Sequence, residues 1–448
     1  MTKNLTVGNP ALLIVGFTLP LIIGNLFQQF YNMADALIVG RTIGIHALAA
    51  VGSVGSMNFL VLGFMIGFTQ GLSIITAQRF GAGDMDGVRK SFAAGIALGS
   101  IATVALMAAS VVSARPLLRL LNTPPDIIDA AYSYIVVIYW GFPAALLFNL
   151  LSGMMRAVGD SVTPLIFLVI ASVINILLDF AFILWFKTGV EGAAYATVIA
   201  QAISGVLCIP VMVKKFPMLR ARKEDWKRVG ARIWEHGRVA FPMGFQMSII
   251  AIGAVTVTFA LNNLGSTIAV AAYTASQKID MMATMPLSSF GVAMTTYVAQ
   301  NYGARKIDRI KKGILYCYAI SGTFSVVMGL VCFFAGQRFA SLFLGPDQAE
   351  AMALSHTYLK ITGSFYFSLA WLFIARQSLQ GLGNSIVPTL AGIMELLMRV
   401  FAAILLPGFF GFAGLCLANP LAWLGACLPL TIATVLTIRR LDRRKSLA

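Results

Sequence analysis

Twelve long apolar stretches constrain the fold of this 448-residue chain more than any other feature. Each has at least about 20 residues, the length that an α-helix needs to cross roughly 30 Å of hydrocarbon. Hydrophobic residues make up 58% of the chain and charged residues only 11%, unlike the composition of soluble domains. We therefore predict an all-α polytopic membrane protein with twelve transmembrane helices. The stretches lie at residues 11–40, 46–77, 92–113, 130–155, 163–186, 190–213, 238–261, 270–299, 313–336, 352–380, 388–407 and 411–438.

The net charge of +16 follows the predicted topology and does not indicate nucleic-acid binding. With loops numbered alternately from a cytoplasmic N-terminus, 25 of the 33 Lys and Arg residues, Arg376 among them, fall on the cytoplasmic side and five on the other. Three more, Lys278, Lys360 and Arg399, fall within spans. This bias is the positive-inside rule. It predicts that both termini lie in the cytoplasm and that the basic loops contact anionic lipid headgroups.

The cysteines and histidines do not form a metal-binding or disulfide pattern. The five cysteines lie in or beside apolar stretches without CxxC spacing, as expected for small buried hydrophobic residues. The three histidines are isolated, and the chain contains no GxxxxGK[ST] loop of the kind that binds nucleotide phosphates. We therefore expect no cofactor, no metal and no enzymatic activity.

The chain repeats itself with an offset of 222 to 224 residues. AQRFGAGDMD at 77–86 returns as AQNYGARKID at 299–308, and RAVGDSVTP at 156–164 returns as QGLGNSIVP at 380–388. A period this long indicates duplicated lobes rather than a solenoid. Each lobe has six spans, so the copies share one orientation and are related by a pseudo-two-fold axis along the membrane normal. We predict an N-lobe at 1–213, a basic cytoplasmic linker at 214–237 and a C-lobe at 238–448.

A buried acid marks the first span. Gln28, Asn32 and Asp35 are spaced by four and three residues, so a helix places them on one face. A carboxylate at that depth costs a few kcal/mol, and such residues usually serve proton relay, ion binding or substrate pairing.

Three motifs together resemble the multidrug and toxic compound extrusion (MATE) family, and most closely its DinF-like group. They are QQFYNMADALIVGR at 28–41, the doubled AQ-x-[FY]-GA motif and the doubled G-[DN]-S-x-x-P turn. The resemblance covers nearly the whole chain. It implies antiport, in which entry of H⁺ or Na⁺ drives export of amphipathic, often cationic compounds by alternating access between the lobes. We expect a monomer.

The resemblance also implies a cation site in the N-lobe. Its matching residues are Asp35, Asn175, Asp179 and Thr197, with Gln28 in support and Pro20 as a helix-bending hinge. The chemistry agrees, because Asn175 and Asp179 are four residues apart and share a helix face. Two neighbouring carboxylates hold one proton between them, or serve with the amide and hydroxyl oxygens as hard ligands for Na⁺. The residues themselves leave H⁺ and Na⁺ open.

The C-lobe lacks this acidic set. At the repeat offsets, Asp35 corresponds to Val257, Asp179 to Ala403 and Asn175 to Arg399. Acids that bind Na⁺ in spans 7 and 10 of some family members are absent here. The spacing of Glu395 and Arg399 predicts an intrahelical ion pair, either structural or facing substrate. A possible substrate cavity comprises Asp280, Tyr139, Met285, Glu395 and Arg399, although each also fits a packing role.

The alternative function is that of a flippase for lipid-linked sugars or peptidoglycan precursors. Such flippases tend to line their cavity with Arg and Lys, whereas only three basic residues fall within the spans here. We therefore expect a MATE-type exporter.

Overall fold

The structure is a computed structural model that describes residues 4–121, 123–227, 229–344 and 348–446. Every regular element in these ranges is helical, which confirms the predicted fold class. The chain divides into two compact units, and the division cuts two helices. The first unit is mainly Leu19–Ser248, and the second joins Leu5–Thr18 to the chain from Ile249 onward.

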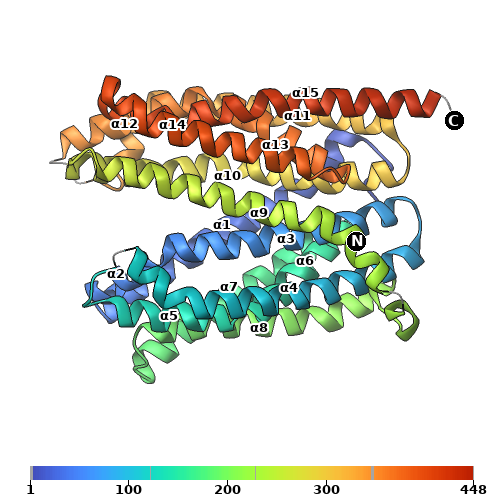
Figure 1. Cartoon of the computed structure of the whole chain (residues 1–448), viewed down its shortest axis with the longest axis horizontal. Coiled ribbons are helices and arrows are strands. Elements are labelled where there is room, and N and C mark those ends of the chain that lie inside the picture. Colours follow the sequence, from blue (N-terminus) through green and yellow to red (C-terminus); the bar gives the residue numbers. More distant parts are fainter. Residues whose placement is uncertain (1–3, 122, 228, 345–347, 447–448) are drawn as a thin grey trace. The chain divides into compact units, whose positions relative to one another are not determined.

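The helices follow one another along the chain as Figure 1 shows. The first copy and the linker comprise α1 (Pro10–Thr42), α2 (Ile45–Ser53), α3 (Gly55–Gly81), α4 (Met85–Leu120), α5 (Ile128–Trp140), α6 (Phe142–Ala157), α7 (Val162–Phe180), the π-helical turn η1 (Ala181–Trp185), α8 (Val190–Lys215) and the 3-10 turns η2 (Pro217–Leu219) and η3 (Lys223–Trp226). The second copy begins with α9 (Val229–Asn262). The second copy continues with α10 (Thr267–Gly303), α11 (Ile307–Ala340), α12 (Ala349–Ser364), α13 (Tyr366–Gly381), α14 (Ile386–Cys416) and α15 (Ala418–Ser446).

Most of the expected spans are long apolar helices. Among the described residues, nine helices are long and apolar enough to cross a membrane, and the bent pairs α5–α6 and α12–α13 bring the number to eleven. At the place of the expected eighth span, α10 is a continuous helix of 37 residues. The second expected stretch is divided at Val54 between α2 and α3, which the sequence did not predict. α14 is kinked at Gly411, whose φ of +56° is not helical, so the helix is interrupted where the twelfth span is expected to begin.

The two copies share one packing pattern. In the first unit α3 packs on α4 and α6, and α8 packs on α5, α6 and α7. In the second unit α10 packs on α11 and α13, and α15 packs on α13 and α14, whereas α12 packs mainly on α10 and α11. The bend between α5 and α6 is 46°, and that between α12 and α13 is 47°. The repeated sequence motifs therefore correspond to a repeated arrangement of helices.

The expected lobe boundaries and the compact units differ at α1 and α9. The first turns of α1 pack within the second unit, and the first half of α9 packs within the first unit. Gly71 has room only for a hydrogen, since a Cβ there would lie 2.5 Å from Cα of Ala240 on α9. Each copy's first helix thus begins in the unit formed mainly by the other copy. The lobe division by sequence remains a prediction, because duplication and compactness are different criteria.

Candidate functional site

A small polar cavity lies inside the first unit, between α1, α3, α6, α7 and α8. Its volume is about 120 Å³, whereas drug-sized ligands occupy pockets of roughly 300–1,000 Å³. The cavity therefore has room for an ion with a few waters. Its polar lining comes from Gln28, Tyr31, Asn149, Ser172, Asn175, Thr197 and Gln201, and apolar residues such as Met65, Phe148 and Leu168 complete the wall.

The two predicted carboxylates meet beside this cavity. Asp35 lies one helical turn beyond Tyr31 on α1, and Asp179 lies one turn beyond Asn175 on α7. Asp179 is fully buried, and the carboxyl groups of Asp35 and Asp179 lie within hydrogen-bond reach of each other. Carboxylate oxygens only accept hydrogen bonds. The contact is therefore a hydrogen bond when the pair carries a proton, and an anionic pair open to a cation when it does not.

Orphaned acceptor oxygens surround this pair. Asn175 donates from Nδ2 to Oγ1 of Thr197 at 3.3 Å, which leaves the Asn175 carbonyl oxygen free to accept. Within the described chain, Oδ1 of Asp35, Oδ1 of Asn175 and both carboxylate oxygens of Asp179 are buried without a hydrogen-bond partner. Buried acceptors are costly when left unpaired. Four such oxygens in one place form a site that a proton or a hard cation would complete.

The π-helical turn η1 begins two residues after Asp179. π-Bulges inside helices are frequent at functional sites. The regular α-helical hydrogen bonding of α7 therefore ends next to Asp179, because the i→i+5 hydrogen bonds of η1 widen the helix there.

The other predicted members of the site are placed unevenly. Gln28 lines the cavity, whereas Asn32 is exposed and is not among the residues that line it. Pro20 lies inside α1, without interrupting the helix. Sequence reasoning missed Tyr31, Asn149, Ser172 and Gln201, although helical spacing offered a signal for three of them. Tyr31 is three residues from Gln28, Ser172 is three residues from Asn175, and Gln201 is four residues from Thr197.

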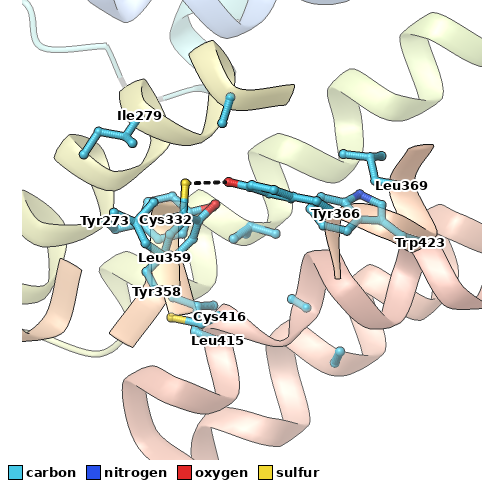
Figure 2. Close-up of a cluster of buried hydrophobic side chains, with 14 of the residues drawn as sticks. Tyr273, Ile279, Cys332, Tyr358, Leu359, Tyr366, Leu369, Leu415, Cys416 and Trp423 are labelled. Atoms are coloured by element: carbon cyan, nitrogen blue, oxygen red, sulfur yellow. Dashed lines mark hydrogen bonds between the residues drawn. The ribbon is translucent and has the colours of Figure 1, made fainter. Parts of the chain in front are cut away.

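The positions in the second unit that correspond to Asp35 and Asp179 are apolar. Val257 and Ala403 are buried in a cluster that also holds Tyr273, Tyr358 and Trp423. Figure 2 shows this cluster, in which aromatic and sulfur-containing side chains fill the space. The acidic site is therefore confined to the first unit within the described chain, in agreement with the sequence contrast.

Asp280 has structural partners in the second unit. The Tyr366 hydroxyl donates to Oδ1 of Asp280 at 2.7 Å. Because that hydroxyl has a single hydrogen, the contact at 3.9 Å between Tyr366 and Cys332 in Figure 2 has the thiol as donor. Asp280 is thus held by α13 at the edge of the cluster.

A buried ion triad lies nearby in sequence and spans α13 and α14. Arg399 donates from Nη2 to Glu395 at 2.7 Å, so the predicted intrahelical pair is present. Arg376 donates to the other carboxylate oxygen at 2.5 Å. The side chains of all three are about 95% buried. Arg376, which the sequence analysis counts with the cytoplasmic segments, thus lies within α13 with its guanidinium buried, because the turn between α13 and α14 brings Glu395 to it.

The remaining candidates for a substrate cavity are packed residues. Tyr139 is fully buried beside Phe142, with ring centroids 5.1 Å apart. Met285 is 8% exposed on α10. Among the residues that the structure describes, no group of three or more His, Cys, Asp or Glu side chains is placed to hold a metal ion.

Comparisons with known proteins identify the family to which these features correspond. The MatE family model matches residues 20–181 and 242–405, two segments that begin 222 residues apart. The "Probable multidrug resistance protein YoeA" of Bacillus subtilis is 29% identical over 395 residues, covering 85% of this chain and 83% of that protein. The DNA damage-inducible protein F of Escherichia coli is 24% identical over 388 residues, covering 84% and 82%.

A solved structure shares the fold over the whole chain. The crystal structure of a MATE protein in complex with MaL6 aligns with a TM-score of 0.92 and 22% identity, covering 99% of this chain and 100% of that one. The two matched segments of the family model also coincide with the two copies found in the sequence.

Proposed function

Because this chain belongs to the MatE family of multidrug efflux transporters, we propose that it is an antiporter in which the Asp35–Asp179 pair binds the coupling cation. Entry of H⁺ or Na⁺ would drive export of amphipathic, often cationic compounds by alternating access. The observation that supports this most is the set of four buried acceptor oxygens without partners around Asp35, Asn175 and Asp179.

The size of the cavity supports a role for an ion. A volume of about 120 Å³ suits a cation with waters and not a drug-sized molecule. Moving one charge across about 100 mV yields about 2.3 kcal/mol, which corresponds to a concentration ratio of roughly 50-fold. Coupling through one cation would therefore be sufficient for substantial efflux.

We further propose a multi-pass monomer in a bacterial inner membrane with both termini in the cytoplasm. The supporting observation is the 25-to-5 bias of basic residues between the two sides. We assign no enzymatic activity and no cofactor to it.

Efflux of a cationic dye from proteoliposomes tests the proposal. An imposed pH gradient and, separately, an imposed Na⁺ gradient identify the coupling ion. Asp35→Asn keeps the size of the side chain but cannot lose a proton or offer a full charge, so we expect it to abolish gradient-driven efflux. Asp129→Asn is the matched control, since Asp129 is an exposed carboxylate of the same unit, paired with Arg115.

Retained efflux in the Asp35→Asn protein, at unchanged expression, would contradict the proposal. A flippase for lipid-linked precursors would show instead as an envelope or growth defect of a deletion strain without any change in dye efflux.

A further inference from the structure

A second, larger cavity in the first unit has no part in the proposed cation site. It is a groove of about 620 Å³ between α4, α6, α8 and the chain that follows η2. Val104 lies at one end of the groove, and Phe92 and Arg220 lie at the other. Leu147 and Ile209 line its walls. Apart from Ser100 and Thr103 near the deep end, its lining is apolar until Arg220. The groove is therefore suited to a long hydrocarbon chain.

The length of the groove is close to the hydrocarbon thickness of one membrane leaflet. Phe92 and Val104 are twelve residues apart on one helix, which corresponds to about 18 Å at 1.5 Å per residue. Half of a hydrocarbon core of about 30 Å is about 15 Å. The deep end also lies at Pro143, next to the 46° bend between α5 and α6. A lipid of a single leaflet would thus reach from the linker side to the middle of the span.

Positive charge is concentrated at the other end. Arg220 is exposed where it lines the groove, and Arg222 and Lys223 follow it as exposed residues. Neither Arg220 nor Lys223 has an ion-pair partner within the described residues. Trp226, which is 45% exposed, is of the type enriched at the membrane–water interface. The end of the groove therefore offers a cationic, interfacial site for a headgroup.

We propose that this groove is a binding site for one anionic phospholipid from the leaflet on the linker side. An acyl chain occupies the apolar groove along α4, and the phosphate pairs with Arg220. Anionic lipid is favoured over zwitterionic lipid because Lys and Arg residues at the membrane surface attract the net negative charge of its headgroup.

Helix α6 separates the groove from the cation cavity and lines both of them. Leu146, Leu147 and Leu150 face the groove, whereas Ala145 and Asn149 line the polar cavity. α6 is thus the wall between the two.

Native mass spectrometry of the purified full chain, mixed with phosphatidylglycerol or phosphatidylcholine in detergent micelles, tests the site. We expect one phosphatidylglycerol to be retained at detergent concentrations that strip phosphatidylcholine. Arg220→Glu should reduce this retention at least about tenfold, and Arg220→Lys should restore most of it. Ile209→Trp should block the apolar groove and reduce retention of either lipid.

Two control variants make the result specific. Lys227→Glu changes the same charge in the linker outside the groove, and Val206→Trp adds the same bulk at an exposed position of α8 that does not line it. Both should retain phosphatidylglycerol like the unaltered protein. The proposal is overturned if all variants retain the lipid equally, if both lipids bind equally, or if a transported cationic dye displaces the lipid in proportion to its concentration.

Discussion

Asn175 on α7 and Thr197 on α8 are joined by a hydrogen bond of 3.3 Å at the wall of the polar cavity. The bond fixes which end of the Asn175 amide points toward the acids. With Nδ2 committed to Thr197, the amide oxygen remains an acceptor without a partner. Thr197 therefore acts both as a candidate ligand and as the residue that orients a second one.

The first prediction concerns this pair. Thr197→Val removes the acceptor and leaves the buried Nδ2 of Asn175 unpaired, a cost of about 1–3 kcal/mol. The amide would then be free to turn its nitrogen toward the carboxylates. We expect the coupling-ion concentration that gives half-maximal dye efflux to rise severalfold, with Thr197→Ser close to the unaltered protein. An unchanged ion dependence in the Val variant would remove Thr197 from the site.

A second prediction concerns the turn between α6 and α7. Asp160 accepts hydrogen bonds from Lys215 at 2.6 Å, from the Thr163 hydroxyl at 2.7 Å and from two backbone amides at 2.9 Å. Burial raises the pKa of Asp160, but these hydrogen bonds outweigh it, and the pKa lies below its ordinary value. The ionised form is thus stabilised in the folded state.

The sign of the pH dependence follows from that shift. A carboxyl whose pKa is lower in the folded state stabilises the fold above its unfolded pKa of about 3.9, and the contribution is lost as pH falls through the folded value. Asp160→Asn should therefore lower the free energy of unfolding at pH 7 by about 1–3 kcal/mol and lower the thermal unfolding temperature with it. The difference in stability between the variant and the unaltered protein should shrink below about pH 4. A difference that grows on acidification would contradict this account. The second copy carries Asn384 at this position.

The repeated GA turn provides a third prediction. Gly83 has φ +76° and Arg305, at the same repeat position, has φ +57°. Both amides donate to the residue three positions earlier at 3.0 Å, so the two turns have one shape. Left-handed backbone costs a non-glycine residue about 1–2 kcal/mol.

Arg305→Gly should therefore stabilise the protein by up to about 1 kcal/mol, since the added freedom of the unfolded chain offsets part of the gain. Gly83→Ala should destabilise it by a similar amount. Unfolding of both variants in one detergent measures the difference. Shifts of the same sign would show that the turns are not equivalent.

The buried triad gives a fourth prediction. Glu395 binds both Arg376 and Arg399, so Glu395→Gln leaves two buried guanidinium groups without a counter-charge. Breaking a buried pair in this way costs about 3–5 kcal/mol. Arg376→Gln leaves the neutral Glu395–Arg399 pair and should cost less. The amount of folded protein in the membrane and its unfolding temperature test this order, and equal or reversed effects would contradict it.

A fifth prediction concerns the chain before α1. Arg309 donates to the carbonyl of Gly8 at 2.9 Å and to that of Leu5 at 3.3 Å, and the Leu5 amide donates to Gln300 at 3.0 Å. Arg309→Ala should increase amide hydrogen exchange in residues 5–9 about tenfold or more, because hydrogen bonds to charged groups contribute about 1.5–3 kcal/mol. Lys311→Ala, whose partners are Asp308 and Asp442, is the control. Equal exchange in both variants would contradict the prediction.

Helical periodicity predicted that Asp35 shares a face with Gln28 and Asn32, and the structure places Gln28 at the cavity but Asn32 outside it. A spacing of three or four residues defines a broad face, and only the helices that surround the cavity together with α1 divide that face between cavity and exterior. The ion pair of Arg376 with Glu395 was not predicted for a similar reason. The sequence shows that Arg376 is a basic residue near a turn. Whether it reaches Glu395 depends on how α13 and α14 pack against each other.

The sequence alone determined which segments are membrane spans, that they form two copies, and which charged residues lie within them. Local composition establishes the membrane spans, internal repetition establishes the duplication, and the cost of a charge in hydrocarbon marks Asp35 and Asp179. The tertiary structure decided which of these groups meet. It joins Asp35 to Asp179, returns Arg376 to Glu395, divides α1 and α9 between two compact units and opens the lipid-sized groove beside α6. Those outcomes depend on contacts between residues far apart in the chain, and hydropathy along a single helix carries no information about them.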